Sequence, residues 1–232
     1  MLRWNWFTGA TAVLLAGVLA GCGGERRDEA GDDVAARSAT DAAAETAADA
    51  AADRATAPAA RSAADTAAVV AIGDSAALAL SGALMARVQE ALREGGPAHA
   101  IDFCSELAIP ITLEVQGRLP DGVTVKRTST RIRNPLNSPD SLEQAALAYF
   151  ESELAAGRPL PPYHIQRANG EWRYYKPIVV AEFCTQCHGP REGLDPAVRK
   201  VLAERYPNDH ATGYSPGDFR GVIRVSVPGR SR

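Results

Sequence analysis

The sequence predicts an α+β fold in which N-terminal helices pack on an antiparallel sheet. Helical periodicity dominates the first half of the expected folded region, and strand-like alternation dominates the second half. Strands and crossover helices do not alternate along the chain, as they would in a parallel sheet. Asn169-Gly170, between two alternating segments, is the strongest hairpin signal and favours antiparallel pairing.

Two helices are predicted before the first strand. Leucine and valine recur every four residues from Leu80 to Leu92, as on one helix face, and Gly95-Gly96 ends this helix. A second helix begins at Pro97, because proline is favoured in a first turn. Its apolar spacing places Cys104 on the buried face, and Pro110 is expected to kink or end it early.

The remaining elements are two helices and a set of strands. A third helix opens at Ser138-Pro139-Asp140 and ends before Gly157, and a short helix runs from Asp195-Pro196 to about Arg205. Alternation predicts strands at residues 122–128, 163–166, 171–180 and 219–227.

The length and charge of the chain limit the number of domains and the kinds of partner that we expect. The 232 residues allow one domain of ordinary size plus appendages. There are 25 Lys and Arg against 28 Asp and Glu, which gives a formal charge of −3. Because a domain that binds nucleic acid normally has a basic excess or stripe, we expect no nucleic-acid partner.

Residues 1–22 have the features of a bacterial lipoprotein signal peptide. Arg3 provides a positive start, and residues 10–19 are apolar but too short to span a bilayer. Leu19-Ala20-Gly21-Cys22 matches a lipoprotein cleavage site, so Cys22 is the predicted lipidated N-terminus that anchors the protein to a membrane. No aspartate follows Cys22, which favours the periplasmic side of the outer membrane. The alternative is an ordinary signal peptide with an incidental cysteine.

Residues 23–68 are expected to be a disordered linker. Alanine fills 20 of these 46 positions, and the segment has no aromatic residue and almost no large aliphatic one. Such a segment cannot bury enough apolar area to offset the entropy lost on ordering, although alanine allows transient helix. The folded domain is therefore predicted at residues 69–232.

The pentapeptide Cys184-Thr185-Gln186-Cys187-His188 is the C-x-x-C-H attachment sequence of c-type haem. Two thiols at this spacing can each form a thioether with one haem vinyl group, and His188 then becomes the proximal iron ligand. Export agrees with this prediction, because haem attachment takes place outside the cytoplasm. Three alternatives remain: a thioredoxin-like pair, a zinc site that includes Cys104, and a plain disulfide.

Cys104 has no assigned partner if Cys22 is lipidated and Cys184 and Cys187 hold haem. An unpaired thiol is unusual in an oxidising compartment. We hypothesise that its thiolate is the distal iron ligand, which would lower the reduction potential. The alternative is a buried, inert cysteine. The other candidate distal ligands are Met85, His99, His164 and His210.

A basic stretch ends the first predicted strand. It contains Lys126, Arg127, Arg131 and Arg133. The planar guanidinium suits a carboxylate, so Arg127, Arg131 and Arg133 are candidates to pair with haem propionates. The alternative is a solvated basic loop.

Several motifs in fixed order resemble a known family over about residues 70–228. They are Ala100-Ile101 with Cys104 and Pro110, Arg127-Thr128-Ser129, Arg133-Asn134-Pro135, Asn137-Ser138-Pro139-Asp140, Tyr175-Lys176-Pro177-Ile178, Cys184 to Gly189, Tyr206-Pro207, Gly213-Tyr214, Gly217-Asp218 and Arg220-Gly221. The chain is similar to the c-type-haem-binding PAS-like domains of bacterial periplasmic and sensory proteins, long classed as a domain of unknown function.

This resemblance implies a PAS-like sheet with helices over one face and one covalent haem c. It also implies axial ligation by His188 and Cys104, and a role in redox or small-ligand sensing. The sequence has no kinase, cyclase or receptor output domain, so we expect any signal to pass to a periplasmic partner protein.

The sequence therefore predicts a lipid-anchored, periplasmic, monohaem redox or small-ligand sensor. The alternative is a monohaem electron-transfer cytochrome, although the near-neutral domain offers little electrostatic steering to a partner. An enzyme is not expected, because no His-Arg pair at a recognisable spacing provides a distal acid and base.

Overall fold

The computed structural model describes residues 34–229, with side chains from residue 65 onward. The chain divides into two units, Met1–Ala55 and Thr56–Arg232, and the first contributes only the helical residues 34–55 to the description. The predicted signal peptide, residues 1–22 with Cys22, lies outside the described residues.

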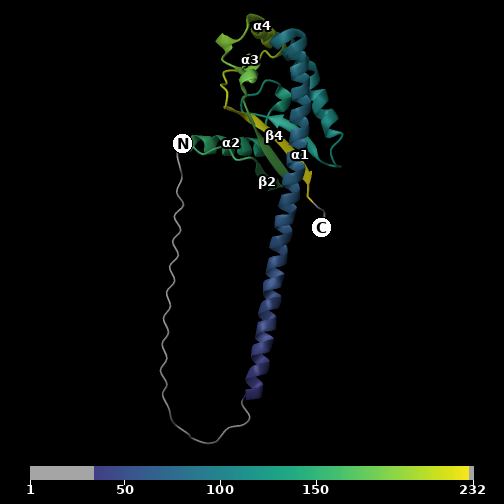
Figure 1. The fold of residues 1–232 in the computed structure, drawn as a ribbon, viewed down its shortest axis with the longest axis vertical. Helices are drawn as coiled ribbons and strands as arrows, with labels where there is room; N and C mark the ends of the chain where they lie inside the picture. The colour runs from purple at the N-terminus through teal and green to yellow at the C-terminus, as the bar shows by residue number, and fades with distance from the viewer. Residues whose placement is uncertain (1–33, 230–232) are drawn as a thin grey trace, which may run out of the picture. The chain divides into compact units, whose positions relative to one another are not determined.

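The described part of the chain mixes helices and strands (Figure 1). The helices are α1 (Val34–Gln116), α2 (Ser141–Ala155), α3 (Thr185–His188) and α4 (Pro196–Arg205), with short 3-10 helices η1 (Pro135–Asn137), η2 (Glu182–Cys184) and η3 (Arg191–Gly193). The strands are β1 (Thr124–Thr128), β2 (His164–Ala168), β3 (Glu171–Val179) and β4 (Phe219–Pro228). Each predicted strand is thus present within a few residues of its expected place.

The strands form one antiparallel sheet in the order β1-β4-β3-β2. The β2–β3 hairpin turns at Asn169 and Gly170, whose φ angles are 54° and 79°. Both angles lie in the left-handed region, which asparagine and glycine tolerate best and which a tight hairpin turn requires. The predicted α+β class and the antiparallel sheet are confirmed.

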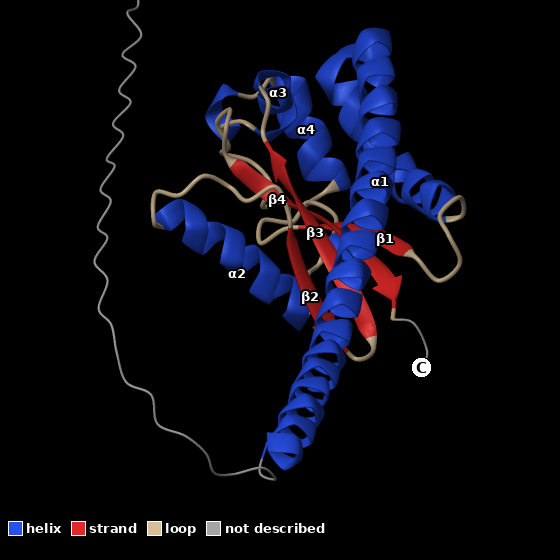
Figure 2. Cartoon of the chain, turned by 60° about the horizontal axis from the view of Figure 1, so that its bottom comes forward, coloured by secondary structure: helices blue, strands red, loops and turns tan. Residues whose placement is uncertain are grey.

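Helix α1 contains a break at Gly95 and Gly96, where the backbone is not helical. The break lies where the sequence predicted the end of one helix and the start of the next. Figure 2 shows the chain reversing there, so that residues 97–116 return beside the preceding part of α1. Leu84 before the break and Ala108 and Val115 after it belong to the same apolar cluster.

Two features of α1 differ from expectation. Residues 34–68, which were expected to be part of a disordered linker, are helical. Alanine has the highest intrinsic helix propensity, so this segment needs little tertiary burial to favour a helix. The helix also continues through Pro110 to Gln116. Pro110 and Glu106 are both exposed, so water can satisfy the carbonyl of Glu106 that Pro110 cannot bond.

The two faces of the sheet have separate cores. On one face, α1 packs its Leu80 and Leu84 into a cluster with Tyr174 and Val225. On the other face, α2 packs Leu147 and Phe150 against the neighbouring Tyr175. Because successive side chains of a strand point to opposite faces, Tyr174 and Tyr175 anchor the two cores from adjacent positions. Figure 2 shows α1 and α2 beside this sheet.

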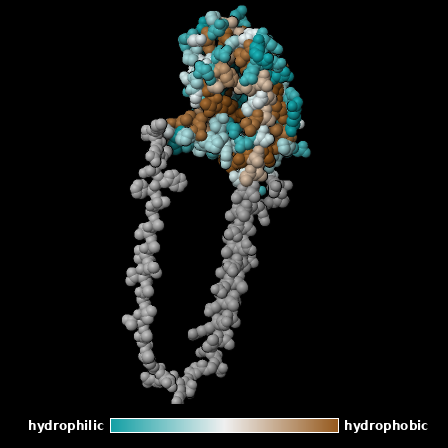
Figure 3. Space-filling model, viewed as in Figure 1, coloured by the Kyte–Doolittle hydropathy of each residue, from teal (hydrophilic) through white to brown (hydrophobic). Residues whose placement is uncertain are grey.

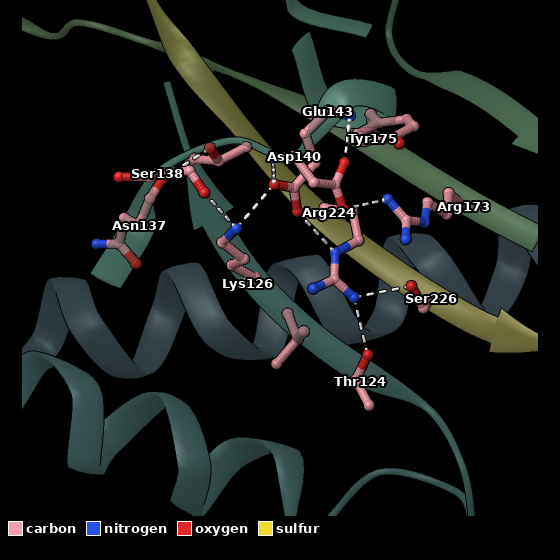
Figure 4. A network of polar contacts seen from close by, with 12 residues as sticks. Thr124, Lys126, Asn137, Ser138, Asp140, Glu143, Arg173, Tyr175, Arg224 and Ser226 are labelled. Carbon is pink, nitrogen blue, oxygen red and sulfur yellow. Dashed lines mark hydrogen bonds and ion pairs between the residues drawn. The ribbon is translucent and has the colours of Figure 1, made fainter. Parts of the chain in front are cut away.

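A buried ion network joins α2 to the sheet (Figure 4). The Glu143 carboxylate is fully buried and lies 2.7 Å from Nζ of Lys126 and 3.2 Å from Nε of Arg224. Glu143 and Asp140 also form a reciprocal capping box that starts α2. The same carboxylate thus begins the helix and fixes it to β1 and β4.

The segment Asp65–Gln116 of α1 is long and apolar enough, by length and composition, to cross a membrane. Core helices of globular domains pass the same test, and this segment places Ala76, Ala77 and Leu80 in the core. We therefore treat it as a core helix. Exposed apolar side chains such as Leu78 and Leu113 remain on its outer side, and Figure 3 shows apolar residues interspersed with polar ones on one face of the molecule.

Candidate functional site

A cavity of about 300 Å³ lies between α1 and the face of the sheet that α1 covers. Its walls come from both sides of the α1 break, from β1, β3 and β4, and from the η2–α3 segment. This volume is at the lower end of the roughly 300–1,000 Å³ of typical small-molecule sites. Segments far apart in the sequence thus meet at one site.

The cavity is lined by both apolar and polar side chains. Leu84, Val88 and Ile101 of α1 contribute apolar side chains, with Ile178 and Ile223 from the sheet. The polar lining includes Arg127, Thr128, Ser129, Arg133, Asn134, Asn137 and Arg220. A large apolar molecule with acidic groups at one edge would match such a lining.

Three residues of the pentapeptide line the cavity: Cys184 at the end of η2, and Cys187 and His188 in α3. Their backbone is held by a neighbouring loop, in which Tyr214 N donates to His188 O at 2.9 Å and Gly213 N donates to Gly189 O at 2.7 Å. Both thiols are free. Burial raises the pKa of Cys187 to about 11, and the nearby Arg133 opposes this shift.

His188 has one ring nitrogen committed and one available. Its Nδ1 lies 2.7 Å from the carbonyl oxygen of Ala211. If Nδ1 carries the proton and donates to that carbonyl, Nε2 keeps its lone pair for a metal ion, which is the usual second-shell arrangement of histidine ligands. Burial, assisted by the positive charge of Arg133, holds the pKa of His188 well below its usual value. The imidazole is therefore neutral at pH 7, as a metal ligand must be.

Cys104 reaches the same cavity from the returning part of α1. Its thiol is free and partly buried. Burial raises its pKa, while the charges of Arg127 and Arg133 act in the opposite direction. Within residues 65–229, no group of three or more His, Cys, Asp or Glu side chains is arranged to hold a metal ion.

Arg133 fixes the backbone around the pentapeptide. Its guanidinium forms two 3.1 Å contacts with the buried carboxylate of Asp209 and donates to Cys187 O at 2.7 Å. The same carboxylate accepts a hydrogen bond from Ala211 N at 2.9 Å. Arg133 and Asp209 thus hold both Cys187 and the Ala211 carbonyl that contacts His188.

A match to a family of known proteins covers this whole arrangement. A family model described as Tll0287-like matches residues 34–228. The chain belongs to the Tll0287-like family. The match starts at the first residue of α1 and ends at the last residue of β4, so it includes every element that lines the cavity.

A solved structure supports the same fold for this Tll0287-like chain. The crystal structure of the cyanobacterial heme-protein Tll0287 matches it with a TM-score of 0.51 and 22% sequence identity. The match covers 72% of this chain and 97% of the other. No match was found among curated proteins. At this identity, the structural likeness establishes the fold.

The residues predicted for the site of this Tll0287-like chain are not all brought together. Arg127 and Arg133 line the cavity with the three cysteines and His188. Arg131 does not: its guanidinium contacts the carbonyls of His210 and Thr212 and lies 4.1 Å above the ring of Tyr214. These contacts hold the Arg131 guanidinium against the loop, and Arg131 does not line the cavity.

Among the other candidate distal ligands, Met85 lines the cavity, whereas His99, His164 and His210 do not. Two further lining residues, Tyr206 and Arg220, were not predicted as site residues. Tyr206 directly follows α4. The hydrophobic pattern of the sequence gives no reason to expect its side chain in the cavity. For Arg220, the sequence signal is the glycine that follows it, Gly221. Its effect on the direction of Arg220 depends on the strand pairing described below.

Proposed function

We propose that this protein binds one haem c covalently in the cavity, through Cys184 and Cys187, with His188 as the proximal iron ligand. The observation that carries the proposal is the convergence of both thiols and an imidazole with an available Nε2 on one cavity. Family membership supports it, because the related Tll0287 is named a heme-protein. The apolar wall and the arginine-containing edge suit a porphyrin with acidic side chains.

The two thiols provide the attachment. Each S–H adds across one vinyl group: the sulfur bonds to the carbon next to the ring, and the hydrogen goes to the outer carbon. No atom leaves and no external oxidant is required for this addition. Cys184 and Cys187 are three positions apart, at the end of η2 and in α3, and both line the cavity.

His188 and Cys104 are the proposed axial ligands. His188 is held by Ala211, which in turn is held by Asp209. Cys104 comes from a different element, α1, and lines the same cavity. A bound haem would supply an iron centre that changes oxidation state and takes small ligands. A thiolate at Cys104 favours a low reduction potential.

The role that we propose is redox or small-ligand sensing in a PAS-like domain, with no enzymatic activity. Cys104 is the position that a small ligand would compete for, and α1 would carry the resulting displacement to a partner protein. We propose that the protein acts on the periplasmic side of the outer membrane, anchored through a lipid on Cys22. A Cys22→Ser variant should then move from the membrane fraction to the soluble periplasmic fraction.

Expression of the full chain with haem-maturation proteins tests the proposal. The purified protein should keep its haem after denaturation and acid–acetone extraction, and its pyridine haemochrome spectrum should be that of haem c. A Cys184→Ala/Cys187→Ala variant should lose the haem on extraction. The control, Met85→Ala, should keep it. Wild-type protein without covalent haem would contradict the proposal.

Carbon monoxide separates the sensor from the electron carrier. A sensor with a displaceable Cys104 should bind CO in its ferrous form, which changes the visible spectrum. An electron carrier should keep both axial ligands and remain unchanged by CO.

A further inference from the structure

Two arginines face the cavity without a carboxylate partner. Arg127 of β1 and Arg220 of β4 both line it. Within residues 65–229, neither guanidinium forms an ion pair with Asp or Glu, and Arg127 makes no side-chain hydrogen bond. By contrast, the guanidinium groups of Arg133, Arg173 and Arg224 are each paired with a carboxylate.

Arg127 and Arg220 are both at least partly buried, so the lack of a carboxylate partner has an energetic cost. Burial lowers the pKa of Arg127 and of Arg220 from the usual value for arginine. A cation removed from water without a counter-ion costs free energy, so buried charges in proteins are normally paired or bound to a ligand. Two such groups on one cavity therefore indicate that the cavity takes an anion.

The backbone of β4 turns Arg220 toward the cavity. Ile178 pairs with Gly221 and Val179 pairs with Phe219, so Arg220 is an extra residue in β4 at an irregularity of the ladder. Gly221 has a φ of 146°, and a Cβ there would overlap the carbonyl oxygen of Thr128. Only glycine fits this position without strain. A bulge of this kind redirects a side chain that regular alternation would place on the other face.

Contacts on one side of Arg220 fix its direction. Its Nη1 donates to the carbonyl oxygen of Arg131 at 3.0 Å, and its Cζ lies 5.2 Å from the ring centroid of Tyr214. Tyr214 also donates its N–H to His188 O. Arg220 and the proposed proximal ligand therefore depend on the same loop residue, and no carboxylate of the described residues pairs with the Arg220 guanidinium.

We propose that Arg127 and Arg220 form a carboxylate-binding pair that holds the acidic edge of the molecule in the cavity. This inference rests on the proposed function, in which the carboxylates are the two haem propionates. It replaces Arg131 and Arg133, whose donors serve the loop and Asp209.

Non-covalent binding isolates the contribution of the carboxylates. In the full chain with Cys184→Ser/Cys187→Ser, titration should give at least tenfold tighter binding of haem than of haem dimethyl ester, whose carboxylates are blocked. Arg127→Gln and Arg220→Gln should each reduce this preference, and the double variant should abolish it. Arg167→Gln, an exposed arginine stacked on Trp172 in the β2–β3 hairpin, should leave it unchanged.

Equal binding of haem and ester by the parent, or a preference that survives in the double variant, would overturn the inference. Covalent haem in the wild-type protein would still support the proposed function in that case. The covalently loaded protein gives a second measurement. Arg127→Gln/Arg220→Gln should lower the reduction potential, because two positive charges near the iron are lost. An unchanged potential would also overturn the inference.

Discussion

Gly73 lies directly against the ring of Tyr174, the largest side chain of the core on the α1 face. A Cβ at Gly73 would lie 2.6 Å from Cδ1 and Cδ2 of that ring, and Tyr174 is fully buried. The ring therefore has no room to move away. The close approach of α1 to β3 depends on the absence of a side chain at this position.

We predict that Gly73→Ala lowers the free energy of unfolding by about 1 to 3 kcal/mol, the usual cost of overpacking a core. Urea denaturation followed by circular dichroism measures this change. The matched control is Gly82→Ala on the same helix, where a Cβ meets no atom within 4 Å. At position 82, the higher helix propensity of alanine should raise the free energy of unfolding by about 0.5 to 1 kcal/mol. Equal effects at both glycines would contradict the packing argument.

At the level of single residues, the sequence predicted that the pentapeptide and Cys104 share one site, and the structure brings them to one cavity; their roles as haem ligands stay a prediction. Arg220 could not be predicted as a site residue. Regular alternation along β4 would group it with Val222 and Arg224, which face α2, and only the irregularity at Gly221 reverses this. The position of Arg131 could not be predicted for a similar reason: it contacts loop carbonyls that a sequence pattern does not reveal, and it does not line the cavity.

Polar contacts attach the helices to both faces of the sheet, and two of them centre on a carboxylate. On the α2 face, Glu143 neutralises Lys126 and Arg224, as Figure 4 shows. On the α1 face, Asp74 accepts hydrogen bonds of 2.6 Å from both Tyr174 and Lys176 of β3. The first connection is buried and the second is more exposed, so they should respond differently to mutation and pH.

Glu143→Gln should destabilise the domain by about 3 kcal/mol, because it leaves two partly buried cations without their carboxylate. Thermal and urea unfolding measure the loss. Glu151→Gln, an exposed position on the same helix, should change stability by less than about 0.5 kcal/mol. A small effect at Glu143 would mean that Lys126 and Arg224 are satisfied by other groups.

Asp74→Asn should reduce stability at pH 7, and the loss should disappear in acid. Hydrogen bonds from Lys176 and Tyr174 hold the pKa of Asp74 below its usual 3.8 in the folded protein. A depressed folded-state pKa stabilises the protein above the unfolded pKa, and this contribution is lost as the pH falls through the folded value. Urea unfolding of both proteins between pH 7 and pH 3 should therefore show the difference shrinking below about pH 4. A difference in stability between the two proteins that stays constant with pH would contradict this role of the Asp74 carboxylate.

The limits of prediction at the level of elements have identifiable causes. Hydrophobic periodicity and capping or turn residues predicted α2, α4 and the β2–β3 hairpin. Asp140 begins α2, Asp195 begins α4, and Asn169-Gly170 form the hairpin turn, so each signal lies within the element itself. Pro110 was misjudged because exposure of the neighbouring turn, which sequence does not reveal, decides whether proline ends a helix. For residues 34–68, the composition favoured disorder and the helix propensity of alanine favoured a helix, and no feature of the segment decides between the two.

For the whole molecule, the class of fold was predictable but the strand order was not. Strand β1 pairs with β4, about a hundred residues away, and nothing in either segment specifies that partner. This pairing brings Arg127 and Arg220 to the same cavity, and the break in α1 brings Cys104 to it. The site is therefore assembled by long-range contacts around a motif that is itself local.

The account depends most on the proposal that Cys104 and His188, which line the same cavity, would both hold one haem iron. The most direct test compares the ferric absorption and EPR spectra of wild-type, Cys104→Ala and Met85→Ala proteins, each loaded with covalent haem. The wild type and Met85→Ala should show low-spin, thiolate-ligated iron, and Cys104→Ala should lose that signature while keeping its covalent haem. A Cys104→Ala spectrum identical to that of the wild type would contradict the account.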